Sequence, residues 1–304
     1  MIANYQNQFL GEELTPAENN PQTAKFHIIP CGLERTVSYG TGTGRGPSAI
    51  IGASHQLERW DGKSEPCTHG IFTHQPLDCR GDIADVMKNL EVKTATIAQE
   101  GKVPVTLGGE HSLTYGAMMG VRDAHEEPVG IIQVDAHADF RLAYQGHRHS
   151  HASVMNLLSS EGASIASIGV RALCKEEDHL RQEVGVTYFD APDLVPGNVQ
   201  SLELPSDFPK KVYLTFDLDG LDPSILPATG TPVSGGLGYY QALNLVRSAL
   251  EGRTCVGFDV VELAPVPNLP ASDFTAAQIT YSLMGIITGE SEGSAGESPA
   301  LKSS

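Results

Sequence analysis

Two segments of the chain carry acidic and histidine side chains at alternate positions, directly after apolar runs. They read VDAHADF and FDLDGLDPS. The first carries Asp135, His137 and Asp139, and the second carries Asp217 and Asp219, followed by Asp222. Alternate residues of an extended chain point to one side and stand about 6.8 Å apart. One carboxylate can then bridge two metal ions about 3.5–4 Å apart while its neighbour binds one of them. The pattern predicts hydrolytic chemistry at a pair of divalent cations.

The acidic side chains themselves indicate which cations to expect. Four aspartates in one partly desolvated place would repel one another strongly, and divalent cations remove this cost. A mixture of carboxylate and imidazole ligands suits Mn²⁺ better than a thiolate-rich zinc site would, although these ligand types also accept Zn²⁺, Ni²⁺ or Fe²⁺. We therefore expect manganese, and the residues alone leave the other three metals open.

A third segment, VTLGGEHSLTYG, follows another apolar run. Gly108 and Gly109 permit a sharp turn that would swing His111 over the ends of the strands as a sixth ligand. Each of these motifs alone is more often a surface turn, a helix cap or a packed side chain. Three of them, each after a predicted buried strand, favour one common metal site.

The segments that must position these residues alternate between strand and helix patterns. Continuous apolar runs, typical of strands covered on both faces, lie at 26–31, 103–108, 129–134, 164–170, 186–189, 211–216 and 255–260. Helical patterns lie at 47–60, 82–100, 111–126, 151–161, 176–184, 237–251 and 273–287. The alternation predicts a parallel sheet with covering helices, either an open three-layer sandwich or a closed (β/α)₈ barrel. Both architectures place ligands at the carboxyl ends of the strands.

One catalytic domain is expected over residues 25–288, because no change of composition divides them. Residues 1–24 have the polar character of an arm, and residues 289–304 are typical of a disordered tail. Inside the domain, the glycine-rich run at 39–49 resembles a dinucleotide fingerprint. Pro47 interrupts that pattern, so a loop that enters a helix is the favoured interpretation.

The composition excludes several classes of partner. The chain has 304 residues, and its 20 Lys and Arg against 37 Asp and Glu give a net charge of −17. Nucleic acids and anionic membranes require clustered cations, so we expect neither as a partner. The sequence shows no secretory signal, no apolar run of about 20 residues and no CxxC motif among its five cysteines. A cytoplasmic protein with reduced cysteines is predicted.

Longer motifs around these residues resemble the ureohydrolase family, which contains the arginases and agmatinases. The matching stretches are GGEHSLT at 108–114, DAHADF at 135–140, SHAS at 150–153, FDLDGLDPSILPATGTPVSGGL at 216–237 and GFDVVELAP at 257–265. The segments at 36–50 and 169–178 are similar to the agmatinase branch. Residues 140–153 lack the polar pattern with which arginases bind the α-amino and α-carboxylate groups of arginine. The resemblance extends from about residue 8 to residue 288.

This resemblance implies a three-layer α/β/α sandwich with a mainly parallel eight-stranded sheet, and a centre of two Mn²⁺ ions per subunit. It implies that one ion is bound by His111, Asp135, Asp139 and Asp217, and the other by His137, Asp135, Asp217 and Asp219. Asp135 and Asp217 would bridge the two ions. Glu262 would receive the guanidinium group of the substrate, His151 would move a proton, and Asp139 would orient the attacking hydroxide.

The predicted reaction is hydrolysis of a small cationic guanidino compound to urea and an amine. Agmatine is the first choice of substrate, because of the agmatinase-like segments. Guanidinobutyrate, guanidinopropionate and arginine stay open as alternatives, and Arg141, Arg148 or Arg171 would then be candidates to bind a substrate carboxylate.

Three further alternatives follow from the same residues. A non-catalytic ureohydrolase-like subunit and a metal-dependent amide hydrolase or deacetylase are the competing classes of protein. A third metal at His147, His149 and His151 is less favoured than a solvated loop that is capped by Ser150. The resemblance also implies a homo-oligomer, either a trimer or a hexamer.

Overall fold

The computed structural model describes residues 7–289, and eight strands form its single sheet. The strands are β1 (Phe26–Cys31), β2 (Ile71–Thr73), β3 (Val103–Gly108), β4 (Val129–Val134), β5 (Ile165–Ile168), β6 (Thr187–Phe189), β7 (Lys211–Asp217) and β8 (Thr254–Val261). Their order is β2-β1-β3-β8-β7-β4-β5-β6, and every pairing is parallel. Because β2 and β6 are free edges, the sheet is open and the barrel alternative is excluded.

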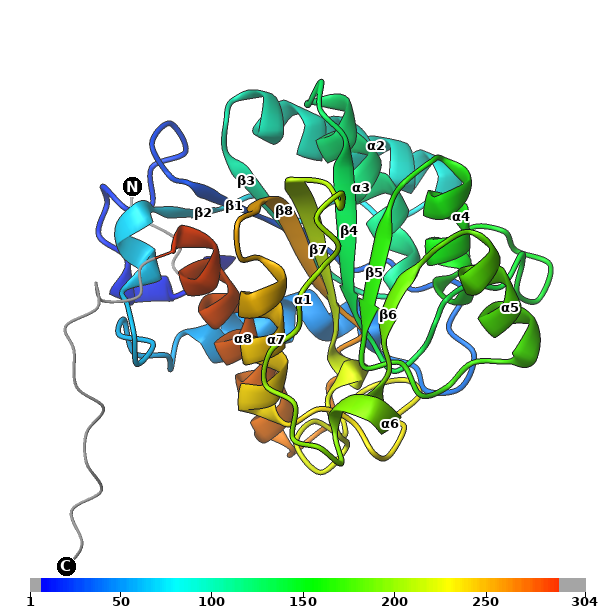
Figure 1. Cartoon of the computed structure of the whole chain (residues 1–304). Coiled ribbons are helices and arrows are strands. Elements are labelled where there is room, and N and C mark those ends of the chain that lie inside the picture. Colours follow the sequence, from blue (N-terminus) through cyan, green and yellow to red (C-terminus); the bar gives the residue numbers. More distant parts are fainter. Residues whose placement is uncertain (1–6, 290–304) are drawn as a thin grey trace, which may run out of the picture.

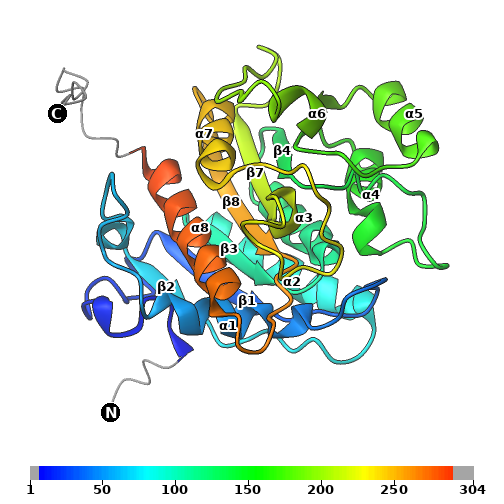
Figure 2. The same cartoon turned by 90° about the horizontal axis from the view of Figure 1, so that it is seen from below.

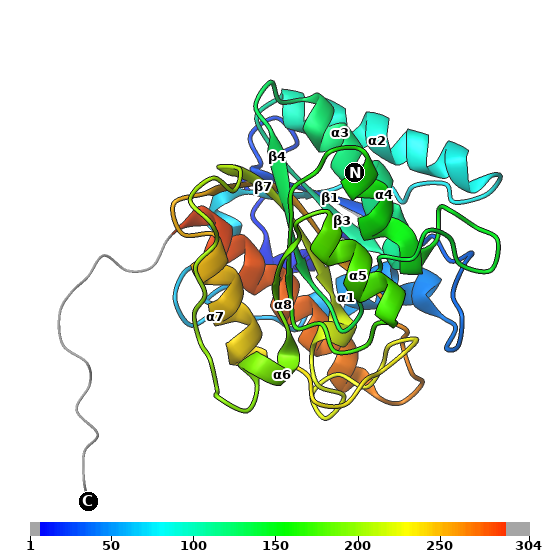
Figure 3. The ribbon, with the colours of Figure 1, turned by 45° about the vertical axis from the view of Figure 1, so that its right-hand side comes forward.

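Helices cover both faces of this sheet (Figures 1 and 2). They are α1 (Gly46–Ser54), α2 (Ile83–Gln99), α3 (Thr114–Asp123), α4 (Val154–Ser160), α5 (Lys175–Glu183), α6 (Ala191–Leu194), α7 (Tyr239–Ala249) and α8 (Pro270–Thr288). α1, α7 and α8 share a core with strand residues such as Ile28 and Leu107, whereas α2, α3 and α4 share a second core with Ile29 and Ile131 (Figure 3). Successive strand side chains point to opposite faces. The predicted three-layer sandwich is therefore confirmed.

The apolar runs form strands because both faces of the sheet are covered. Every residue of β1, β3 and β4 is buried, as continuous apolar sequences in a parallel sheet predict. α2 shows the other pattern: its buried residues Val86, Met87, Leu90 and Ile97 recur at helical spacing on one side. Each segment thus adopts the secondary structure that buries its apolar side chains.

Some predicted element boundaries are wrong. α8 begins at Pro270, with Leu269 as its N-cap residue, rather than at residue 273. α1 ends at Ser54 rather than at Trp60. The edge strand β2 and the short helix α6 match no predicted segment.

The described part of the predicted arm packs on the domain. Phe9 and Leu10 are fully buried, and the backbone N–H of Leu10 donates a 2.8 Å hydrogen bond to Ser54 Oγ at the end of α1. The predicted tail lies outside the described residues, apart from Gly289, which caps α8. Among the described helices, none is long and apolar enough to cross a lipid bilayer.

The strand order creates a natural site in the middle of the sheet. The chain passes from β3 to β4 across the two positions that β8 and β7 occupy. Ligands of open α/β sheets bind outside the carboxyl ends of the strands, where the order changes direction. The four adjacent strands β3, β8, β7 and β4 end at this place.

Candidate metal centre

The structure brings together all six side chains that were predicted as metal ligands. Asp135 directly follows β4, Asp217 ends β7, and His111 follows the glycine turn after β3. Two groups can each hold a metal ion, one made of His111, Asp135 and Asp217 and the other of Asp135, His137 and Asp219. Asp135 belongs to both groups. This arrangement supports the predicted bridging role of Asp135.

His111 faces three carboxylates at short range. Its Nδ1 lies 2.9 Å from Asp139 Oδ2, 3.1 Å from Asp135 Oδ2 and 3.3 Å from Asp217 Oδ2. On the second side of the site, His137 Nδ1 lies 3.0 Å from Asp219 Oδ2 and 3.5 Å from Asp135 Oδ1. One imidazole thus stands on each side of a shared aspartate.

Hydrogen bonds behind His111 fix the orientation of its ring. Its Nε2 lies 2.8 Å from Thr215 Oγ1, and that hydroxyl donates a 2.6 Å hydrogen bond to Asp259 Oδ1. Because the only hydrogen of the hydroxyl goes to Asp259, His111 must donate from Nε2. Nδ1 is then directed at the carboxylates, where it makes no hydrogen bond although it is buried.

The charges at this site require a positive charge between them. Burial opposes a charge on His111, but the three carboxylates that face its Nδ1 outweigh burial and raise the pKa of His111 well above its ordinary value. Burial, followed by the charge of Asp135, raises the pKa of Asp139 to about 7. Burial, followed by the charges of Asp219 and Asp135, also raises the pKa of Asp217 well above its ordinary value. Divalent cations would remove this repulsion, so the residues fit a metal centre.

Backbone and side-chain donors hold the carboxylates in place. Asp135 accepts hydrogen bonds from Gln133 Nε2 at 2.8 Å and from the His137 N–H at 2.6 Å. Asp217 Oδ1 accepts from the Asp219 N–H at 2.8 Å. Such bonds orient metal ligands before any ion binds.

Glu262 follows β8 beside these ligands. Its Oε1 accepts a 2.7 Å hydrogen bond from the His111 N–H, and its own N–H donates to Gly109 O at 2.9 Å. Burial raises the pKa of Glu262 to about 8. Glu262 and Asp139 have positive φ angles of 67° and 52°, which are uncommon for residues with a side chain and cluster at functional sites.

His151 begins a 3₁₀ turn before α4, and Ser150 Oγ caps this turn by accepting from the Ala152 N–H at 3.2 Å. The predicted Ser150 cap is therefore confirmed. His151 Nδ1 lies 3.1 Å from Thr36 Oγ1, and the ring of Tyr144 meets the His151 ring edge-on with centroids 5.5 Å apart. Burial lowers the pKa of His151, which favours the neutral imidazole.

A family model described as the arginase family matches residues 24–285. The chain belongs to the arginase family. The N(1)-aminopropylagmatine ureohydrolase of Synechocystis sp. is 36% identical over 291 residues, which cover 91% of this chain and 93% of the relative. The protein of the same name from Thermus thermophilus is 34% identical over 282 residues, with the same coverage. The predicted family is thus confirmed, and so is the predicted enzyme class, an agmatinase-type hydrolase, at the level of these relatives.

Solved structures agree with this arginase-family assignment. The crystal structure of the agmatine ureohydrolase of Thermoplasma volcanium is 27% identical to this chain, with a TM-score of 0.77 over 89% of this chain and 92% of that one. An arginase from Medicago truncatula has a TM-score of 0.76 at 23% identity, over 87% of this chain and 88% of that one, and supports the fold.

The sequence did not single out three further residues of this arginase-family site: Glu110, Thr36 and Asp259. Both acids are fully buried; Glu110 lies two residues after the end of β3, and Asp259 lies within β8. An acid inside an otherwise apolar strand, as Asp259 is, is a signal that the sequence does contain. Thr36 lies on a loop, 115 positions before His151, and no sequence pattern links the two.

The three arginines that were considered for a substrate carboxylate have other partners. The Arg171 guanidinium donates to five backbone carbonyls, those of Gly169, Asp219, Gly220, Leu221 and Val233. Arg141 stacks on Tyr144 and lies 3.6 Å from Glu177. Arg148 Nη2 lies 3.5 Å from Ser160 Oγ. Arg171 is therefore a structural residue, because its hydrogen bonds connect the segment at 219–221 with Val233.

Two alternative sites are not supported by the described residues. Neither His147 nor His149 belongs to a group that could hold a metal. In the glycine-rich loop, the Glu34 carboxylate accepts the N–H groups of Gly42 and Gly44 at 2.7 and 2.8 Å, where a phosphate would otherwise bind.

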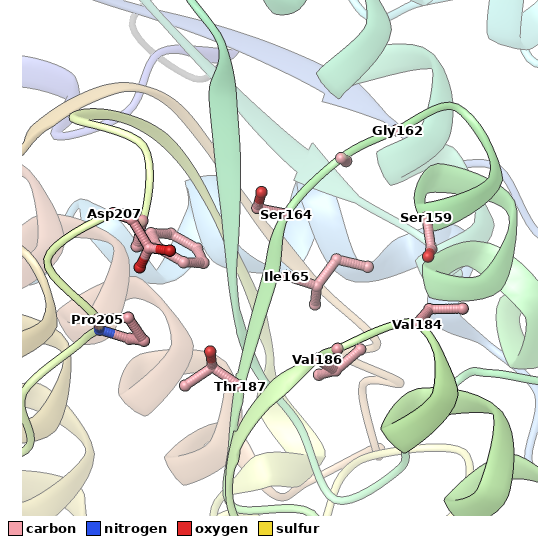
Figure 4. Close-up of a pocket in the computed structure, with 12 residues that line it drawn as sticks. Ser159, Gly162, Ser164, Ile165, Val184, Val186, Thr187, Pro205 and Asp207 are labelled. Atoms are coloured by element: carbon pink, nitrogen blue, oxygen red, sulfur yellow. The ribbon is translucent and has the colours of Figure 1, made fainter.

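A pocket of about 550 Å³ lies at the end of the sheet where β5 and β6 begin (Figure 4). Ser164, Ile165 and Thr187 line it at the amino ends of β5 and β6. Asp207 is its only acidic lining residue among those described. The predicted metal ligands lie at the carboxyl ends of the strands, so this pocket is separate from the candidate metal centre.

Proposed function

We propose that this arginase-family chain hydrolyses a linear guanidino amine to urea and an amine at a centre of two Mn²⁺ ions. The observation that carries the proposal is the cluster itself: His111 Nδ1 faces three carboxylate oxygens within 3.3 Å, and Glu262 is hydrogen-bonded to the same residue. Nitrogen and oxygen ligands of this kind suit Mn²⁺.

The proposed ligand sets are those that the family resemblance implies. One ion is held by His111, Asp135, Asp139 and Asp217, and the other by His137, Asp135, Asp217 and Asp219. The short distances from the two imidazoles to these carboxylates support both sets. The two ions would lower the pKa of a bound water, so that hydroxide is present at neutral pH.

The chain's own residues then orient the reactants. Asp139 orients the nucleophile through a carboxylate oxygen. Glu262 holds the guanidinium group through paired, charge-assisted hydrogen bonds, which fixes the trigonal carbon in front of the nucleophile. The tetrahedral intermediate collapses to urea and an amine, and His151 delivers the proton that the leaving amine needs.

Two observations support an amine rather than a carboxylate at the far end of the substrate. Arg171 is bound to backbone carbonyls and Arg141 lies between Tyr144 and Glu177, so neither is available for a carboxylate. The relatives that are 36% and 34% identical bear the name N(1)-aminopropylagmatine ureohydrolase. We propose N(1)-aminopropylagmatine as the preferred substrate, with spermidine and urea as products.

Agmatine, the substrate that the sequence predicts, is the second candidate. It is supported by the likeness to the agmatine ureohydrolase of Thermoplasma volcanium. A cytoplasmic location and a trimer or hexamer stay predictions from the sequence and from the family resemblance.

A panel assay separates these substrates. Urea release is measured with added Mn²⁺ from N(1)-aminopropylagmatine, agmatine, arginine, guanidinobutyrate and guanidinopropionate. We expect kcat/KM for N(1)-aminopropylagmatine to exceed that for agmatine at least about tenfold, which corresponds to about 1.4 kcal/mol. A higher kcat/KM for agmatine would return the preference to the second candidate, and no urea from any compound would contradict the proposed function.

A further inference from the structure

Glu110 is a fully buried acid that lies next to the metal centre and binds no predicted metal ligand side chain. Its carboxylate accepts four hydrogen bonds. Oε2 accepts the backbone N–H groups of Arg35 and Thr36, the latter at 2.6 Å. Oε1 accepts the hydroxyls of Thr36, at 2.9 Å, and of Ser112. Glu110 is therefore surrounded by donors on both oxygens.

Thr36 connects this carboxylate to His151. A threonine hydroxyl has one hydrogen to donate and two lone pairs that accept. The Thr36 hydroxyl donates its hydrogen to Glu110 Oε1, and its oxygen accepts the His151 N–H at 3.1 Å. The same oxygen lies 3.1 Å from His151 Nδ1. With its hydrogen already engaged, Thr36 can meet Nδ1 only as an acceptor.

The alternative orientation of the Thr36 hydroxyl is less favourable. If the hydroxyl donated to His151 Nδ1, it would exchange a bond to a buried carboxylate for a bond between neutral groups. Hydrogen bonds to ionised acceptors are roughly twice as strong as neutral ones. The carboxylate therefore keeps the hydrogen.

We propose that Glu110, acting through Thr36, holds neutral His151 as the tautomer that carries its hydrogen on Nδ1. Nε2 is then the nitrogen that takes up and delivers the proton of the reaction. Glu110 and Thr36 are positioning residues in this arrangement, and they do not touch the substrate. This inference rests on the proposed function, because it assigns the proton transfer to His151.

Glu110→Gln tests the proposal because backbone N–H groups fix which way the oxygen of the new amide points. The two backbone N–H groups of Arg35 and Thr36 require an acceptor, so they select the amide oxygen at the position of Oε2. The amide NH₂ then faces the Thr36 hydroxyl and donates to it. The hydroxyl turns its hydrogen toward His151 Nδ1, and the tautomer reverses.

The tautomer is read directly by neutron diffraction from deuterated crystals of the Mn²⁺-loaded enzyme without substrate. A pD of about 9 keeps an imidazole neutral. We expect a deuteron on His151 Nδ1 in the unchanged protein and on Nε2 in Glu110→Gln. Ser112→Ala removes the other hydroxyl that donates to Glu110 Oε1 without touching His151, and we expect it to keep the deuteron on Nδ1.

Kinetics with the preferred substrate supply a second readout. In Glu110→Gln and Thr36→Val we expect kcat to fall by about tenfold or more, within the range of general acid–base contributions, while KM and bound metal change little. Thr36→Ser retains the hydroxyl and should restore most of the kcat that Thr36→Val loses.

A deuteron on Nε2 in the unchanged protein, or an unchanged tautomer in Glu110→Gln, would overturn the inference. The deuteron positions do not depend on turnover. If the substrate panel released no urea, the tautomer result would still decide this inference separately from the proposed function.

Discussion

The two histidines that matter most at this site are held in the same way. A threonine hydroxyl that donates to a buried acid stands beside a ring nitrogen of His111 and of His151. The acids are Asp259 for the first histidine and Glu110 for the second. Because an ionised carboxylate can only accept, each threonine is left as an acceptor, and the ring nitrogen on the other side is free for chemistry.

At the scale of single residues, the ligand assignment predicts a graded loss of metal. Asp219→Asn should lower bound manganese from about two ions per chain to about one, because Asp219 belongs to the second group only. Elemental analysis after gel filtration measures this content. Asp222→Asn is the matched control, since Asp222 lies in the same segment but accepts from the N–H groups of Gly235 and Gly236. Equal metal in both variants would contradict the ligand sets.

Glu262→Gln should separate metal binding from substrate binding. The amide oxygen can still accept the His111 N–H, so we expect the fold and the metal content to be retained. The amide loses the charge that pairs with guanidinium, so kcat/KM should fall by about 10³-fold, as for other preorganised electrostatic contacts. Steady-state kinetics on the metal-loaded variant test this. Near-normal kinetics would remove Glu262 from substrate binding.

At this scale the sequence predicts the residues that would bind metal better than the residues that hold the catalytic groups in place. The six ligands stand in short motifs after apolar strands, so their spacing alone indicates their chemistry. Thr36 meets His151 only because the fold brings a distant loop to it, and no local pattern encodes that contact. The arginines show the same limit: Arg171 has the charge for a substrate, but its contacts make it structural.

At the scale of elements, the turn after β3 shows how closely the site is packed. A Cβ at Gly109 would lie 2.0 Å from the backbone oxygen of Leu33, and Gly109 O also accepts the Glu262 N–H. Gly109→Ala should therefore displace the loop and Glu262 together. We expect a stability loss of about 2 kcal/mol or more, in the range of overpacked cores, and a large loss of activity.

The matched control for that change is Gly52→Ala in α1. An added Cβ at Gly52 meets nothing within 4 Å, and alanine is the better helix former. We expect this variant to be unchanged or more stable by up to about 1 kcal/mol, with full activity. Chemical denaturation of both variants measures the difference. A Gly109→Ala protein as stable and active as the control would contradict the packing argument.

A second prediction at this scale concerns the segment before β1. Glu18 forms a double hydrogen bond with Arg59 at 2.7 and 3.1 Å, and this contact lowers the pKa of Glu18 from 4.5 to about 2. A lowered acid pKa contributes stability above pH 4.5 that is lost as the pH falls toward about 2. Glu18→Gln should lose about 1 kcal/mol at neutral pH, less than the full shift implies because solvent screens the pair.

Thermal unfolding of that variant from about pH 2 to 7 tests this sign. At neutral pH the unchanged protein should have a higher melting temperature than Glu18→Gln, and this difference should disappear near pH 2. Glu65→Gln is the control, because Glu65 is 45% exposed and 3.5 Å from the same arginine. A constant difference in melting temperature at all pH values would show that the ionised pair is not the cause.

The elements themselves were largely predictable, and the exceptions have physical reasons. Strands buried on both faces need continuous apolar runs, so six of them stand out in the sequence. The seventh predicted run became the edge strand β6, which is not buried on both faces, because Tyr188 is exposed. β2 has three residues and lies at the edge of the sheet, where it is too short to show a pattern. α8 starts at Pro270 because proline suits the first turn of a helix, whereas Asp273 lies one turn inside. The strand order depends on contacts between distant segments and is not encoded locally.

At the scale of the whole molecule, the charge of −17 has a local consequence. Four of the acidic side chains, Asp135, Asp139, Asp217 and Asp219, meet at the ends of two neighbouring strands in the centre of the sheet. The four negative charges therefore repel one another strongly at the centre of the sheet. The stability of the entire domain should depend on what neutralises these charges.

Metal removal should consequently destabilise the protein in a pH-dependent way. The raised pKa of Asp139, about 7, means that the metal-free fold loses stability as the pH rises from 3.8 toward 7, because the ionised form is disfavoured there. Mn²⁺ binds the ionised ligands, so protons compete with it at low pH. The gain in melting temperature on adding Mn²⁺ to chelator-treated protein should be larger at about pH 7.5 than at about pH 5.5. At a hundredfold excess over Kd, the gain in the free energy of unfolding should be about 2.7 kcal/mol. His111→Ala should lose most of this gain, whereas an equal melting temperature with and without Mn²⁺ at both pH values would contradict a metal centre.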